Sequence, residues 1–295
     1  MALVDPLFEI LAPERWHLPV VFNSPHSGQF MPQGLLKHTR LSGTALRQSE
    51  DCYVDELFSG CVDHGAPMLR ALASRAYLDL NREPYELDAR MFAESLPGYM
   101  NPGSPRVAAG FGTIPRLVGD SSEIYRAHLP LGEAHERIDT FYKPYHRALS
   151  GLLNESQAAT GFVLLLDCHS MPSSAAKQTA PHVKSADIVL GDRFGSACAG
   201  ELSESVESFF VDQGLHVIRN KPYAGGFITE SYGAPHQNRH AVQIEVNRAL
   251  YMDERNFRRS PGFVGLQAML SKISVYLNEI ISEFHEPTPY VQAAE

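Results

Sequence analysis

Two histidines in this sequence follow short apolar runs, and each is followed by a serine. His26 lies in residues 24–28 (SPHSG), and His169 lies in residues 167–170 (DCHS). An imidazole at the end of a buried strand can reach an α/β active site, and imidazole is a common ligand of zinc and related ions. Either histidine alone could equally be a structural turn residue. Two of them, after separate strands, favour one shared metal site.

A catalytic zinc site usually has three protein ligands and one open position, so a third ligand is needed. Glu50 and Asp51 are candidates, although an acid at a helix start also stabilises the helix without binding metal. Spacing alone does not choose between them. Asp167 is read instead as a group that could orient an imidazole by accepting its N–H. For His146 a structural or substrate-contacting role is favoured over a ligand role.

Glu245 alternates with Ile244 and Val246 in an apolar run, so its side chain points to the opposite face of the expected strand. An acid inside such a strand is costly unless it is paired or functional. Beside a metal it could act as a general base. The alternative is an internal ion pair with Arg248.

Three arginines, Arg75, Arg82 and Arg248, lie near expected strand ends. The guanidinium fork binds both oxygens of a carboxylate, so the three together favour an anionic substrate. Any one of them could instead form a surface ion pair. The Gly225-Gly226 pair allows close approach of backbone to a ligand, but it lacks the lysine and spacing of a phosphate loop.

These residues need a scaffold, and the apolar pattern indicates one. Strands are expected at residues 18–23, 67–72, 76–80, 162–166, 186–190, 215–219 and 241–246. Helical stripes are expected at residues 54–61, 138–152 and 266–280. Alternation of the two predicts a single α/β domain over residues 1–295, with a mostly parallel mixed sheet flanked by helices and ligands at the carboxyl ends of the strands. The Pro- and Gly-rich segments 83–125 and 220–238 are expected to be functional loops.

Composition excludes several classes of protein. The formal charge of −9 argues against nucleic acid as a partner. The four cysteines contain no C-x-x-C pair, which argues against a zinc ribbon and favours a reducing compartment. The N-terminal segment has neither the basic start nor the apolar run of a signal peptide, and no apolar run is long enough to span a membrane. A cytoplasmic location is therefore expected, with no membrane partner, while the oligomeric state stays open.

The motifs taken together resemble the N-formylglutamate amidohydrolase family over roughly residues 20 to 255. The segments that carry the resemblance are residues 24–28, 51–57, 74–75, 79–82, 144–146, 167–172, 225–226 and 240–248. That family looks like a relative of the zinc carboxypeptidases and aspartoacylase-type deacylases. The resemblance therefore implies a carboxypeptidase-like fold.

The resemblance also implies a ligand set and catalytic roles. His26, His169 and Asp51 would hold a divalent metal, zinc first and cobalt as an alternative. The relatives place their carboxylate ligand three residues after the first histidine, where this chain has Gln29, so the carboxylate must come from elsewhere. Asp51 fits the pattern of the amidohydrolase family better than Glu50 does. Glu245 corresponds to the catalytic base and Arg82 to a second catalytic residue. Substrate binding is implied for Asn81, Arg75, Arg248, Gly226, His146 and His240.

The implied reaction is hydrolysis of N-formyl-L-glutamate to formate and L-glutamate, a step of histidine degradation. One alternative is a deacylase or carboxypeptidase-like enzyme that acts on another N-acyl acidic amino acid. A second alternative is a catalytically inactive protein that binds an acidic amino acid. The native metal, the exact acyl group and the pairing of each arginine with a substrate carboxylate are left open by the sequence.

Overall fold

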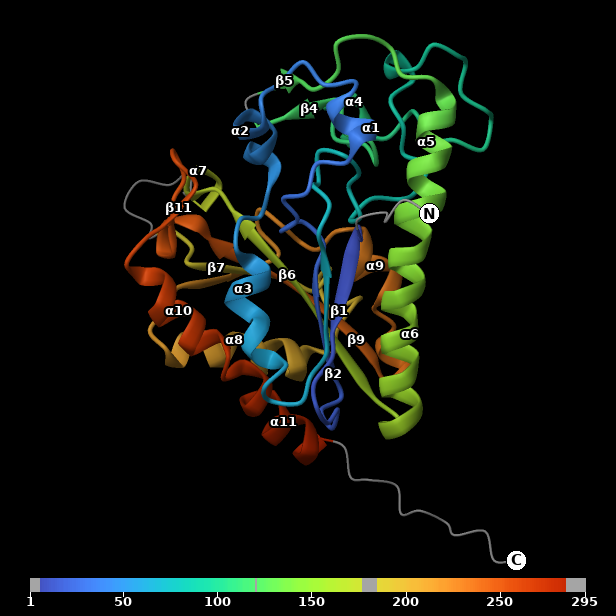
Figure 1. Cartoon of the computed structure of the whole chain (residues 1–295). Helices are drawn as coiled ribbons and strands as arrows, with labels where there is room; N and C mark the ends of the chain where they lie inside the picture. Colours follow the sequence, from blue (N-terminus) through green and yellow to red (C-terminus); the bar gives the residue numbers. More distant parts are fainter. Residues whose placement is uncertain (1–5, 120, 177–184, 285–295) are drawn as a thin grey trace, which may run out of the picture.

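The computed structural model describes residues 6–119, 121–176 and 185–284. Its centre is a seven-stranded sheet in the order β1-β3-β2-β6-β9-β7-β8 (Figure 1). The strands are β1 (Phe8–Leu11), β2 (Val20–Ser24), β3 (Met68–Ala71), β6 (Val163–Met171), β7 (Ile188–Gly191), β8 (Val217–Arg219) and β9 (Arg239–Asn247). Only the pairs β1–β3 and β9–β7 are antiparallel, and the other four are parallel. The predicted α/β domain with a mostly parallel mixed sheet is confirmed.

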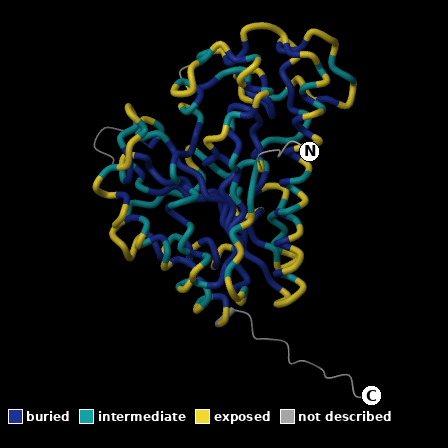
Figure 2. Tube along the Cα trace, in the orientation of Figure 1, coloured by how far each residue is buried: buried dark blue, intermediate teal, exposed yellow. Residues whose placement is uncertain are grey.

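Helices cover both faces of this sheet. Successive residues of each strand point to opposite sides, and because the residues on both sides are apolar, each face needs a covering layer. In β2, Phe22 packs in one apolar cluster with residues of α3 (Val54–Phe58), α8 (Gly200–Asp212), α10 (Gly262–Leu270) and α11 (Ile273–Phe284). Its neighbour Val21 packs in a second cluster with α6 (Lys143–Thr160) and α9 (Phe227–Tyr232). Figure 2 shows the buried sheet at the centre and the exposed outer surfaces of the helices.

A group of short elements and loops lies at the top of Figure 1. It contains α1 (Gln33–Leu36), α2 (Gly43–Leu46), α4 (Pro105–Ala108), β4 (Leu117–Val118) and β5 (Ser122–Glu123). Further short elements are α7 (Ser173–Ala176), β10 (Met252–Asp253) and β11 (Arg258–Arg259). Much of the predicted loop segment 83–125 belongs to this group.

Helix α5 (Leu131–Arg137) continues into α6 through a π-helical turn, Ile138–Tyr142. Arg137, fully buried before the turn, donates to the carbonyl oxygens of Tyr77 and Gly34 and to the hydroxyl of Tyr125. Tyr142, the last residue of the turn, donates to the carbonyl oxygen of Arg82 at 2.7 Å. The helix therefore holds residues 77–82 against the sheet.

Three local predictions differ from the structure. Residues 76–80, predicted as a strand, form a buried loop, so Arg82 does not close a strand. The backbone N–H of Asp79 bonds the carbonyl of Thr113 instead of a neighbouring strand. Strand β6 runs on to Met171, which places His169 inside the strand instead of after it. The sequence patterns also missed β1 at the edge of the sheet.

The C-terminal helix predicted at residues 266–280 is divided between α10 and α11.

Within the described residues no helix combines the length and apolar character needed to cross a bilayer.

Candidate metal centre and active site

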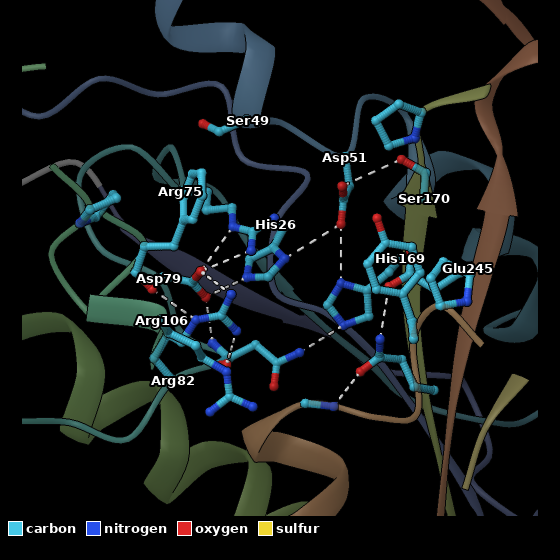
Figure 3. Close-up of a pocket in the computed structure, with 18 of the residues that line it drawn as sticks. His26, Ser49, Asp51, Arg75, Asp79, Arg82, Arg106, His169, Ser170 and Glu245 are labelled. Carbon is cyan, nitrogen blue, oxygen red and sulfur yellow. Dashed lines mark hydrogen bonds and ion pairs between the residues drawn. The ribbon is translucent and has the colours of Figure 1, made fainter. Parts of the chain in front are cut away.

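Three buried side chains, His26, Asp51 and His169, meet at the carboxyl end of the sheet (Figure 3). Oδ2 of Asp51 lies 3.4 Å from Nδ1 of His26 and 3.1 Å from Nδ1 of His169. One ligand atom from each residue lies within 4.8 Å of the others. The arrangement arises because β2 and β6 are parallel neighbours, and because the N–H of Asp51 donates to the carbonyl of His26 at 3.0 Å.

The second nitrogen of each imidazole faces a carboxylate. Nε2 of His26 lies 2.8 Å from Oδ1 of Asp79, and Nε2 of His169 lies 3.0 Å from Oδ2 of Asp167. In each ring the Nε2 contact is shorter than the contact of Nδ1 with Asp51, so we assign the proton of the neutral imidazole to Nε2. The Nδ1 atoms that face Asp51 are then left as electron-pair donors. Nδ1 of His26 is buried and has no hydrogen-bond partner. Two such nitrogens and one carboxylate oxygen form a donor set that suits zinc, and these residues therefore fit a divalent cation.

Of the two candidate acids, Asp51 belongs to this group and Glu50 does not. Glu50 accepts from Nε of Arg47 at 2.8 Å and is absent from the pocket wall. Burial alone would raise the pKa of Asp51, but the two neighbouring imidazoles of His169 and His26 hold that pKa well below its usual range. Its other oxygen, Oδ1, accepts from Nη2 of Arg248 at 3.0 Å.

Glu245 lies beside this group, because β9 pairs with β6 in a register that sets Glu245 opposite His169. Its Oε1 accepts from Nε2 of Gln243 at 2.7 Å. Burial raises the pKa of Glu245 to about 7, so this carboxylate exchanges its proton near neutral pH. The predicted alternative, an ion pair between Glu245 and Arg248, does not form: within the described part of the chain Glu245 has no salt bridge, and Arg248 instead contacts Asp51, Ser170 and the carbonyl of Glu50.

Arg75 and Arg82 line the same pocket. Nε and Nη2 of Arg75 contact Oδ2 of Asp79 at 3.0 and 2.9 Å. Arg82 donates to the carbonyl oxygens of Phe111 and Asn81, and its Nη2 lies 3.8 Å from Asp79. These contacts fix the orientation of both guanidinium groups at the wall of the cavity.

Asn81 and Gly226 are packed against each other. Oδ1 of Asn81 accepts from the N–H of Ile228 at 2.8 Å, and its Nδ2 lies 3.3 Å from Nε2 of His169. A Cβ atom at Gly226 would lie 2.4 to 2.7 Å from the Asn81 side chain. The absence of a side chain at Gly226 is thus what lets Asn81 approach His169.

Two predicted substrate-binding residues lie elsewhere. His146 is not part of the pocket wall; its ring nitrogens contact the Tyr232 hydroxyl and the carbonyl of Leu80, both at 3.0 Å. His240 lies near the amino end of β9, where its Nδ1 accepts from the N–H of Ala199. Both histidines have packing and backbone-binding roles in this structure.

The cavity has a volume of about 570 Å³. Besides the predicted residues, its wall includes Gln48, Ser49, Arg106 and Phe111, which the sequence did not assign to the site. It also includes Tyr223, which lies in the same segment as the predicted Gly225-Gly226 pair. Arg106 and Phe111 lie in the segment 83–125, whose sequence has no helical or strand period that would place them. The one feature that pointed to this segment was the presence of arginines and aromatic residues in a long Pro- and Gly-rich loop.

Comparisons with known proteins agree on one family. The model of the family described as N-formylglutamate amidohydrolase matches residues 18–252. Two curated relatives named N-formylglutamate deformylase are similar to the chain. The one from Pseudomonas aeruginosa is 30% identical over 257 residues, 84% of this chain and 87% of the relative. The one from Pseudomonas putida is 28% identical over 257 residues, 83% of this chain and 86% of the relative. A crystal structure of N-formylglutamate amidohydrolase from Ralstonia eutropha is similar with a TM-score of 0.88 and 34% identity, over 94% of this chain and 99% of that one.

Proposed function

Because this chain belongs to the N-formylglutamate amidohydrolase family, we propose that it hydrolyses N-formyl-L-glutamate to formate and L-glutamate with a divalent metal, as a step of histidine degradation. The observation that carries the proposal is the convergence of His26, Asp51 and His169 with Glu245 and several arginines in one buried pocket. A cytoplasmic location is part of the proposal, supported by four cysteines that are all free and buried.

Nδ1 of His26, Nδ1 of His169 and Oδ2 of Asp51 would hold the metal, zinc in this proposal and cobalt as the alternative. A bound ion of this kind polarises a carbonyl group and lowers the pKa of water. Arg248 keeps Asp51 in place through its 3.0 Å contact with Oδ1. We therefore assign Arg248 to positioning of Asp51 instead of to the substrate.

Glu245 is the general base in this mechanism. Its carboxylate takes a proton from the attacking water and later delivers that proton to the nitrogen of the departing glutamate. The pKa of about 7, raised by burial, allows both transfers near neutral pH. The hydrogen bond from Gln243 fixes one carboxylate oxygen and leaves the other to contact water.

The arginines divide into two roles. Burial lowers the pKa of Arg75, but the charges of Asp79, Asp51 and Glu245 raise it overall, which indicates that Arg75 borders the reacting centre. We assign Arg75 to the oxyanion that forms as water attacks. Arg82, which the resemblance gave as the second catalytic residue, reaches Asp79 only at 3.8 Å and donates instead to the carbonyl oxygens of Phe111 and Asn81. We assign Arg82 to a substrate carboxylate, together with Asn81.

The test is release of formate from N-formylglutamate by chelator-treated protein to which zinc or cobalt has been restored. N-formylaspartate and N-acetylglutamate serve as comparison substrates. We expect release from N-formylglutamate to be fastest and to depend on added metal. Faster acetate release from N-acetylglutamate would favour the deacylase alternative. Ligand protection in a thermal melt without turnover of any substrate would favour the inactive binding protein.

A further inference from the structure

Arg106 is a cation of the pocket whose donors are almost unused. It lies on α4, within the loop segment 83–125, and it lines the same cavity as the His26–Asp51–His169 group. Its single ion pair with a described residue is a long one, 3.8 Å from Nη1 to Oε1 of Glu86. No hydrogen bond joins its guanidinium to any described residue, although a guanidinium carries five N–H donors.

The other three arginines of the cavity are already engaged. Arg75 contacts Asp79 through two nitrogens, Arg82 donates to two carbonyl oxygens, and Arg248 is bound to Asp51, Ser170 and a carbonyl. Arg106 is also the most exposed of the four arginines. Of its side chain 42% is exposed, against 25%, 15% and 9% for Arg75, Arg82 and Arg248. Arg106 is therefore the arginine of this wall that is most available to a ligand.

The charges around Arg106 favour an anion. Burial and the positive charges of Arg75 and Arg106 lower the pKa of Arg82. The counter-charge is incomplete, because Glu86 reaches Arg106 only at 3.8 Å and its Oε2 is buried without a hydrogen-bond partner. The cavity wall carries four arginines and three carboxylates, in a chain whose net charge is −9, and this local balance favours an anionic ligand. A carboxylate between Arg82 and Arg106 would relieve the repulsion between them.

We propose that Arg106 binds the side-chain carboxylate of a dicarboxylic N-acyl amino acid, while Asn81 and Arg82 bind its α-carboxylate. The assignment rests on the proposed function, which sets the reacting amide beside Glu245 and the His26–Asp51–His169 group. In such a substrate the side-chain carboxylate is further from the amide nitrogen than the α-carboxylate is. Figure 3 shows Arg82 and Arg106 on the side of His26 opposite to Glu245, and Arg106 is the outer of the two by exposure.

This subsite makes Arg106 a specificity-determining residue. A guanidinium that pairs with a carboxylate forms two charge-assisted hydrogen bonds. An uncharged amide at the same position can form only weaker ones. The enzyme should therefore distinguish glutamate derivatives from glutamine derivatives through Arg106.

The test compares Arg106→Met and Arg106→Lys with wild type, each loaded with zinc. Calorimetry measures binding of L-glutamate and L-glutamine, and formate release measures kcat/KM for N-formylglutamate and N-formylglutamine. In Arg106→Met we expect glutamate binding and kcat/KM for N-formylglutamate to fall by about 10- to 100-fold. Both glutamine values should stay within about 3-fold, and Arg106→Lys should recover part of the loss.

Arg90→Met is the matched control, because Arg90 lies in the same loop segment, is 62% exposed and pairs with Asp88 outside the cavity. It should leave all four values unchanged. Equal losses for the glutamate and glutamine compounds in Arg106→Met, or no loss for either, would overturn the subsite. If wild type released no formate but bound glutamate through Arg106, the proposed function would fail and the subsite would stand. If wild type and Arg106→Met both turned over N-formylglutamate at the same rate, the proposed function would stand and the Arg106 subsite would fail.

Discussion

Nε2 of Gln243 lies 2.7 Å from Oε1 of Glu245 and donates a hydrogen bond to it. The carbonyl oxygen of the same Gln243 side chain accepts from the N–H of Gly226, also at 2.7 Å. One amide therefore joins the proposed base to the glycine loop of the pocket wall. Because Gln243 and Glu245 are two residues apart in β9, they lie on the same face of the strand.

Replacing Gln243 with Leu is expected to lower kcat roughly 10- to 100-fold, because a base displaced by even about 1 Å loses much of its effect. KM should change little, since Gln243 is not assigned to substrate binding. Steady-state kinetics of formate release separates the two constants. Gln267→Leu is the control, because Gln267 bonds the carbonyl of Glu56 away from the cavity. A raised KM at unchanged kcat would contradict the positioning role.

Glu245→Gln keeps the size of the side chain and removes its basicity. Turnover is expected to fall by about 10²- to 10⁴-fold, the usual contribution of a general base. Metal content, measured by elemental analysis, should stay at the wild-type level, because Glu245 is not one of the three grouped ligands. Near-normal turnover in this variant would rule out Glu245 as the base.

Asp167→Asn removes the charge that holds the proton on Nε2 of His169. Zinc affinity is expected to fall by about 10- to 100-fold, as for other carboxylates that orient a metal-binding histidine. Competition with a chromogenic chelator measures the change. Asp192→Asn serves as the control, because Asp192 is an equally buried acid that pairs with Arg219 and lies outside the cavity wall. Equal zinc affinity in the two variants would show that Asp167 does not act through His169.

Gly226→Ala is expected to reduce activity without unfolding the protein. The backbone φ of Gly226 is −88°, which alanine adopts readily, but the added Cβ would collide with the Asn81 side chain that contacts His169. Activity and a thermal melt together separate the two effects. Gly265→Ala in α10, where a Cβ would meet no atom within 4 Å, should be neutral or slightly stabilising. Full activity in Gly226→Ala would argue against a role for Asn81.

His146 gives the stability a dependence on pH. Burial lowers the pKa of His146 from 6.5 to about 4, so the unfolded chain binds this proton more readily. The free energy of unfolding should therefore decrease as the pH falls from about 6.5 towards about 4, by up to about 1.4 kcal/mol per pH unit. Urea unfolding of wild type and His146→Gln over this range measures the difference in slope. His128→Gln is the control, because His128 is exposed, and it should keep the wild-type slope. A wild-type slope in His146→Gln as well would contradict the contribution of His146.

The sequence predicted those site residues that a strand pattern positions. His26 follows β2, and Glu245 alternates with apolar neighbours in β9, so the period of a strand sufficed to place them. The run at residues 76–80 was assigned wrongly because burial on all sides makes a loop look like a strand. His240 shares β9 with Glu245, but five residues separate them by roughly 16 Å. Arg106 lies in a loop whose contacts are long-range, and no local pattern predicts it.

The π-helical turn at Ile138–Tyr142 makes the site depend on the rotational phase of a helix. Arg137 before the turn and Tyr142 at its end hold residues 77–82 from two sides. A π turn contains one residue more than an α turn. The wider turn accommodates that residue locally, so the helix keeps its phase on both sides of the turn. Adding or removing a residue in the regular helix on either side would instead rotate the chain beyond it by about 100° about the helix axis. A change of chain length is thus better tolerated inside this turn than beside it, and the turn itself contributes no residue to the wall of the catalytic pocket.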